Sequence, residues 1–134
     1  MVSTITTSLV EIQNNKERYT SVVETASHYF FDCPYNKEAG KAVISLILPL
    51  DQTFSKEKAL KCVISCDALY ETAAILILAT GLELIAKKRK DGKKTSVAEV
   101  RAELESLCGL LHRARARRLR EAAAMVRNQI TNFL

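Results

Sequence analysis

The 134-residue chain contains no tryptophan, only four glycines and only two prolines. Glycine and proline are the residues that interrupt helices most strongly. Their scarcity, together with abundant Ala, Leu, Glu, Lys and Arg, predicts an all-α fold. A hydrophobic content of 48% excludes a disordered polycation. The length suits one domain with a hydrophobic core but not two, so we expect a single helical domain over residues 1–134.

Several functional signatures are also missing. The N-terminus lacks the cationic segment and apolar stretch of a signal peptide, which predicts reduced cysteines in a cytosolic or nuclear setting, and of the two we expect the cytoplasm. The most apolar stretch, residues 73–86, is short and contains Glu83, so it favours a buried helix over a membrane span. No glycine-rich phosphate loop, paired-carboxylate arrangement or His-Glu-x-x-His motif is present. We therefore expect neither an enzyme nor a bound cofactor.

Apolar spacing predicts a bundle of about four helices. The predicted helices cover approximately residues 4–31, 37–48, 56–88 and 96–128. Pro34 and Pro49 end the first two, because the residue before a proline avoids the helical conformation. The third is apolar on most sides and should be central. Ser96 and Glu99 have the spacing of a capping box, which predicts the start of a long, basic, amphipathic last helix.

The charge of the chain is segregated. Residues 1–86 carry a net charge of −3, and residues 87–134 carry +8. The densest basic stretch is Leu-Leu-His-Arg-Ala-Arg-Ala-Arg-Arg-Leu-Arg at 110–120, and no acid interrupts it. A cationic segment of this kind is typical of proteins that bind polyanions. A solvated helix face is the alternative interpretation.

A continuous last helix of thirty residues would span roughly 45 Å and present two faces. The predicted apolar face contains Val97, Val100, Leu104, Leu107, Leu111, Ala114, Ala122 and Met125. The opposite face contains Ala102, Ser106, Gly109, Arg113, Ala116, Arg117, Arg120, Ala124 and Arg127. Small side chains on that face let a partner approach while the arginines reach phosphates. Arg115 and Arg118 project toward the core side, so either the bundle ends before them or they line an open seam that a ligand fills.

This pattern predicts a protein that binds double-stranded RNA by shape, because the grooves of an RNA duplex offer little sequence information. Phosphate contacts would make the affinity depend steeply on salt. The expected RNA-binding residues are Arg113, Arg117, Arg120 and Arg127, supported by Arg115, Arg118, Lys93 and Lys94. The lysines belong to a basic loop at 87–94, which we expect to touch the same polyanion or to act only as a solubilising loop.

The stretch from Val100 to Arg120 resembles the recognition helix of nodaviral RNA-silencing suppressors. It shares that helix's rhythm of Val, an acid, Leu, a large apolar residue, Leu and then cations. The residues that fit its apolar seam are Glu103, Leu104, Leu107 and Leu111. Arg113, Arg117 and Arg120 fall where members of that family place RNA-contacting basic residues. The resemblance implies a homodimeric viral protein that shields duplex RNA from the host silencing nuclease in the host cytoplasm.

The cysteines suggest one metal-binding alternative. Cys62 and Cys66 lie one helical turn apart on the predicted third helix, and Cys108 and His112 do the same on the fourth. If the two helices are antiparallel neighbours, these four side chains would converge as a tetrahedral zinc site. Cysteine is also a common small core residue, and we expect packing and no metal.

Two other functions remain open. A protein-interaction module would dock an acidic partner on the last helix through apolar anchors. Those anchors would be Leu119, Met125, Val126, Ile130 and Phe133. A peripheral membrane protein would lay a basic amphipathic helix on anionic lipid. The arginines lack a flanking tryptophan and the apolar face is needed for the core, so we expect no membrane partner.

Overall fold

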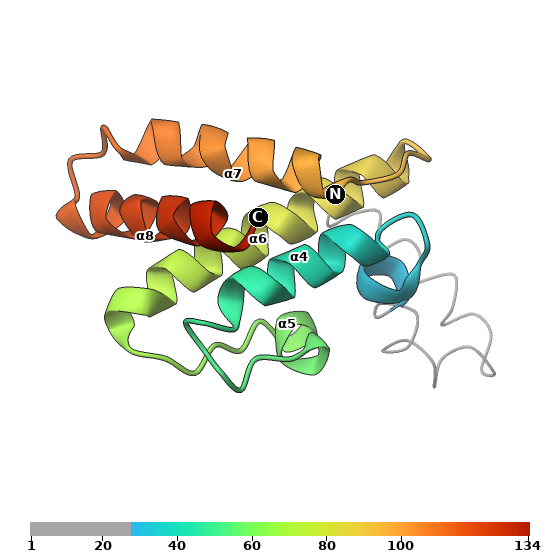
Figure 1. The fold of residues 1–134 in the computed structure, drawn as a ribbon, viewed down its shortest axis with the longest axis horizontal. Helices are drawn as coiled ribbons and strands as arrows, with labels where there is room; N and C mark the ends of the chain where they lie inside the picture. The colour runs from blue at the N-terminus through green and yellow to red at the C-terminus, as the bar shows by residue number, and fades with distance from the viewer. Residues whose placement is uncertain (1–27) are drawn as a thin grey trace, which may run out of the picture.

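A computed structural model describes residues 28–134, which contain helices and no strand (Figure 1). The elements are the π-helical turn η1 (His28–Asp32) and the α-helices α4 (Lys37–Ile47), α5 (Lys56–Lys61), α6 (Ala68–Lys90), α7 (Val97–Leu111) and α8 (Arg117–Phe133). The predicted all-α bundle is confirmed. Most of the predicted first helix lies outside the described residues. None of the helices in residues 28–134 is both long and apolar enough to cross a membrane.

Helix α6 is the centre of the bundle and contacts α4, α7 and α8. Its most deeply buried residues are Ala73, Ala74, Ile77, Ile85 and Ala86. The predicted central helix is therefore confirmed in position, but its start at residue 56 is wrong. Cys62 ends α5 in the left-handed conformation, with φ of 55°, and α6 begins only at Ala68. Between them the amide of Ser65 donates to the carboxylate of Asp51 over 2.8 Å, and this bond replaces a helical one.

Helix α4 matches its prediction closely. Its apolar face is buried and consists of Ala39, Ala42, Val43, Leu46 and Ile47. The helix packs tightly on α6, because Gly81 leaves no room for a Cβ atom beside Val43. This close contact fixes the base on which the two last helices rest.

The predicted continuous last helix is wrong. It begins as predicted, with a complete capping box between Ser96 and Glu99, but α7 ends at Leu111 and the chain turns back before α8. Figure 1 shows α7 and α8 running side by side as a hairpin. The reversal buries Val126 and Ile130, each worth about 1.5–3 kcal/mol. That gain exceeds the loss of a few helical hydrogen bonds of about 1 kcal/mol each.

Buried hydrogen bonds fix the hairpin to the rest of the bundle. The side chain of Gln129 on α8 donates to the carbonyl of Leu46 over 2.8 Å. At the other end, the hydroxyl of Thr95 donates to the side chain of Asn36 over 3.2 Å, and the Thr95 amide donates to the carbonyl of Tyr35. The hairpin is thus held along its length, and the α7–α8 turn protrudes at one end of the bundle (Figure 1).

Candidate nucleic-acid interface

Five arginines gather where α7 gives way to α8. Arg113, Arg115, Arg117, Arg118 and Arg120 lie in the turn and in the first turn of α8, and all five are exposed. We call this group the basic turn. Residues 112–120 contain no acid, so no carboxylate within this segment offsets its positive charge.

Most of these guanidinium groups are unpaired. Within residues 28–134, the side chains of Arg113, Arg115 and Arg118 form no hydrogen bond or ion pair. Arg117 pairs with Glu121 over 2.8 Å, but its side chain is 84% exposed. Exposed pairs one helical turn apart contribute only about 0.3–0.5 kcal/mol, so a stronger anion can displace this one.

Arg115 and Arg118 do not project toward the core, as a continuous helix would require. Both alternatives drawn from the sequence assumed a continuous helix, but α7 ends at Leu111, before Arg115, and Arg118 lies in the first turn of α8. Both side chains are exposed beside Arg113 and Arg117. A straight helix would divide these arginines between two faces. The turn instead places them together at one end of the molecule.

Arg120 has a structural role that the sequence did not reveal. Its Nη1 atom donates to the carbonyls of Ala114 and Arg115, over 2.7 and 2.8 Å. Both carbonyls belong to the turn, so Arg120 holds it in shape. Its Nε and Nη2 donors remain for a ligand.

The start of α8 departs from the rules that favour helices. Ala116 provides no side-chain cap, and the first turn contains no acid. Cations at a helix N-terminus oppose the macrodipole, by about 0.3–1 kcal/mol each. Free amides at the same place attract anions, as the arginines do. Local rules are most often broken at functional sites, which makes this end of the hairpin the candidate site.

The structure splits the predicted RNA-binding set. Lys93 and Lys94 are exposed, but they lie before the start of α7, whereas the basic turn follows its end. A helix of 15 residues separates them by about 22 Å. The 87–94 loop and the basic turn therefore lie at opposite ends of α7, and contact of this loop with the same polyanion stays a prediction. Lys88 in that region already pairs with Glu99, and this hydrogen bond lowers the pKa of the Glu99 carboxyl despite its partial burial.

The four residues of the zinc alternative do not converge. Among the described residues, no group of three His, Cys, Asp or Glu side chains could hold a metal ion. Cys62 lies on the α5–α6 connection, not on the central helix. Cys108 is buried and its thiol lies 3.4 Å from the carbonyl of Ala123, while burial raises its pKa. His112 is exposed at the end of α7.

The interaction anchors predicted on the last helix are mostly used by the core. Val126 and Ile130 are 1% and 2% exposed, Leu119 and Met125 are half-buried, and of the five only Phe133 is largely exposed. α8 cannot offer Val126 or Ile130 to a partner without unfolding. The sequence reasoning missed Leu110 instead, which is 73% exposed. Leu110 is the first residue of the basic stretch at 110–120, where its apolar side chain was not singled out.

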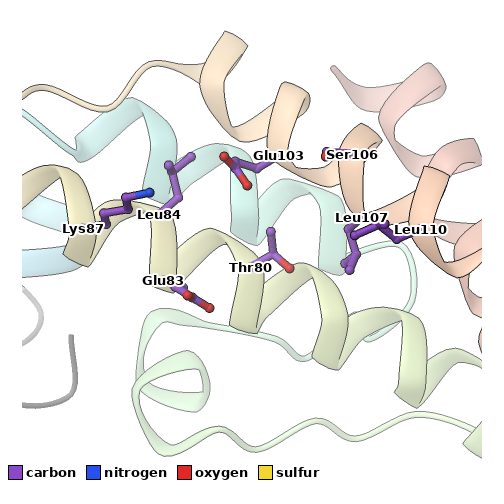
Figure 2. A pocket seen from close by; sticks show the side chains of 8 residues that line it. All are labelled: Thr80, Glu83, Leu84, Lys87, Glu103, Ser106, Leu107 and Leu110. Atoms are coloured by element: carbon purple, nitrogen blue, oxygen red, sulfur yellow. The ribbon is translucent and has the colours of Figure 1, made fainter.

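Leu110 borders a groove of about 250 Å³ between α6 and α7 (Figure 2). The groove is lined by Thr80, Glu83, Leu84, Lys87, Glu103, Ser106, Leu107 and Leu110. In the part of the chain that the structure describes, no ion pair joins Glu83, Lys87 or Glu103 to another residue. The groove thus has a mixed lining, in which three leucines lie beside polar residues and charged residues of both signs.

Comparison with known proteins finds no match for this chain among protein-family models, curated proteins or solved structures. The resemblance to nodaviral suppressors therefore rests on residues 100–120, which are divided between α7, the turn and the start of α8.

Proposed function

We propose that this protein binds double-stranded RNA through the basic turn, without reading its sequence. One observation carries the proposal: five exposed arginines, three of them unpaired among the described residues, surround an uncapped helix start. Guanidinium groups donate to phosphate in a fixed fork, and such backbone contacts supply affinity without sequence information.

A duplex suits this surface better than a single strand. Proteins that bind single strands stack successive bases on aromatic side chains. Residues 109–132 contain no Phe, Tyr or Trp, and the chain has no tryptophan. The basic turn offers charge without stacking, which matches the phosphates that flank the shallow groove of an RNA duplex. Contact by the tip of a hairpin replaces the contact along a rod that the sequence predicted.

The resemblance of residues 100–120 to nodaviral suppressors supports a biological role for such binding. On this proposal the protein is a viral suppressor of RNA silencing that sequesters duplex RNA in the host cytoplasm. Sequestration needs no catalytic group, only an affinity high enough to exclude the nuclease.

The test is fluorescence anisotropy of the full chain with a duplex RNA, the corresponding single strand and a DNA duplex of equal length. The turn variant combines Arg113→Gln, Arg115→Gln and Arg118→Gln, which leaves the bonds of Arg117 and Arg120 intact. We expect the duplex RNA to bind more tightly than the single strand. We also expect the turn variant to lose at least about a hundredfold in affinity, since each charge-assisted contact contributes about 1.5–3 kcal/mol.

The matched control removes three cations from the opposite end, by Lys90→Gln, Lys93→Gln and Lys94→Gln. Its net charge equals that of the turn variant, so general electrostatic attraction falls equally in both. Equal losses in the two variants, or equal binding of duplex and single strand by the unmodified protein, would contradict the proposal. Tighter binding of the DNA duplex would assign the surface to DNA.

We further propose that the protein is a homodimer, paired through the α6–α7 groove. Leu110 is the most exposed large apolar side chain of the described residues, and the rim charges are unpaired among them. A two-fold axis would seat Leu110 in the partner's groove and set Lys87 against Glu83 or Glu103 of the other copy. Two basic turns would then act on one duplex.

A further inference from the structure

A second hollow, of about 350 Å³, lies between the end of α7 and the side of α8. It is lined by Cys108, His112, Arg120, Ala123, Ala124 and Arg127. No acidic side chain is part of its wall. It adjoins the basic turn through Arg120 but is a separate, concave site.

The two arginines are placed as a pair. Arg120 and Arg127 are seven residues apart on α8, so they lie on the same side of the helix about 10 Å from each other. Arg120 is held by the carbonyls of the turn, which fixes its guanidinium before any ligand arrives. The Arg127 side chain has no hydrogen bond or ion pair within residues 28–134. Two alanines between them, Ala123 and Ala124, leave the space open.

The rest of the wall is also free of negative charge. His112 adds a ring that can donate a hydrogen bond from the α7 side. At the floor, burial raises the pKa of the Cys108 thiol, while the positive charge of Arg127 acts in the opposite direction. Arg127 and Cys108 both line the hollow. The two arginines, about 10 Å apart, repel each other weakly, and an anion bound between them would offset that repulsion.

We infer that this hollow binds the phosphate monoester of a nucleotide, and that on duplex RNA it takes the 5′-terminal phosphate. The inference rests on the proposed function. A phosphate monoester carries about −1.5 to −2 charges at pH 7, which matches two guanidinium groups better than the single charge of an internal phosphodiester. The volume is at the lower end of the range for ligand pockets, so it suits one terminal nucleotide and not a continuing strand.

The experiment compares a 3′-labelled RNA duplex with 5′-phosphates and the same duplex with 5′-hydroxyls, using the full chain and fluorescence anisotropy. Ala124→Leu fills the hollow without changing its charge, because Ala124 is an exposed position in α8. Arg127→Gln removes one cation. Ala98→Leu, at another exposed alanine that does not line the hollow, is the matched control. Circular dichroism melts verify that each variant is folded.

We expect the 5′-phosphate duplex to bind about tenfold more tightly than the 5′-hydroxyl duplex, the effect of roughly one charge-assisted contact. Ala124→Leu and Arg127→Gln should abolish that preference, and Ala98→Leu should keep it. The inference is overturned if the unmodified protein binds both duplexes equally, or if the preference survives in both hollow variants.

A second experiment distinguishes binding of a strand end from binding of a free nucleotide. It also tests the hollow independently of whether the protein binds RNA. Adenosine 5′-monophosphate and adenosine are titrated while amide NMR shifts are followed. If neither duplex binds but the monophosphate alone shifts resonances, and Ala124→Leu removes that shift, the nucleotide site stands and the RNA function falls. Shifts by both compounds, or by neither when both duplexes bind equally, would overturn the nucleotide site.

Discussion

Reversing the charge of Arg118 should stabilise the fold while it weakens RNA binding. Arg118 lies in the first turn of α8, is exposed and has no ion pair among the described residues. Arg118→Glu removes a cation that opposes the helix macrodipole and adds an acid that favours it. Each of these changes contributes about 0.3–1 kcal/mol. We expect the free energy of unfolding to rise by about 1 kcal/mol and the melting temperature by roughly 3–5 °C.

The same substitution should lower RNA affinity about tenfold or more, because one phosphate contact is replaced by repulsion. The slope of log K against log salt concentration should fall by about one unit. Thermal melts by circular dichroism and anisotropy titrations between about 50 and 200 mM salt measure the two effects on the same preparation.

Lys90→Glu is the matched control, since it makes the same charge change in the last turn of α6. There the cation agrees with the macrodipole, so the reversal should destabilise the protein by about 0.3–1 kcal/mol. It lies before α7, at the opposite end from the basic turn, and should leave the salt slope unchanged. A loss of stability in Arg118→Glu, or equal losses of RNA affinity in both variants, would refute the reasoning.

Three further predictions concern other parts of the chain. Burial alone would raise the pKa of Asp51, but hydrogen bonds from Ser65 and Thr53 lower it overall. Asp51→Asn should therefore lower the free energy of unfolding by about 1–3 kcal/mol, measured by urea unfolding at pH 7. This difference should disappear as the pH falls through the lowered pKa of the folded state, below about 4. Leu110→Ser should make the protein monomeric in multi-angle light scattering while its circular dichroism spectrum stays helical, because Leu110 is exposed in the single chain; a persistent dimer would exclude the groove. Ser96→Ala should lower stability by about 1 kcal/mol and leave RNA affinity unchanged, since it removes only the capping box of α7.

The features predicted correctly from the sequence are those with a local cause. The apolar face of α4 follows from the spacing of its own residues. The start of α7 follows from Ser96 and Glu99, which bond to each other across three positions. Such signals need no knowledge of the rest of the chain, because the interacting groups are neighbours in sequence.

The two helix breaks have distant causes and were not predicted. Good helix formers fill residues 110–120, yet the chain turns there because the apolar side of α8 has a better place against α6 and α7. The break after α5 depends on the Asp51 carboxylate, which comes from 14 residues upstream to bind the Ser65 amide. In both cases tertiary contacts outweigh local preference.

The candidate site was predicted in composition but not in shape. Arg115 and Arg118 indicated that the predicted helix could not simply continue along the core. Two cations on an apolar helix face are stable only where the bundle ends or where a ligand binds them. The role of Arg120 in closing the turn could not be predicted, because its acceptors are backbone carbonyls that exist only once the chain has turned. The distance of Lys93 and Lys94 likewise depends on α7 lying between them and the turn.

The turn also changes how much of a duplex one chain should occupy. A straight basic helix of roughly 45 Å would contact phosphates along most of its length. The basic turn comprises one reversal and one helical turn of about 5 Å, so its contacts should extend over a much shorter stretch of duplex. Stoichiometric titration of a long duplex, using Leu110→Ser to keep the chain monomeric, measures this directly. Saturation at a duplex length per chain well below roughly 45 Å would fit contact by the tip, whereas one chain per roughly 45 Å or more would contradict the basic turn as the binding surface.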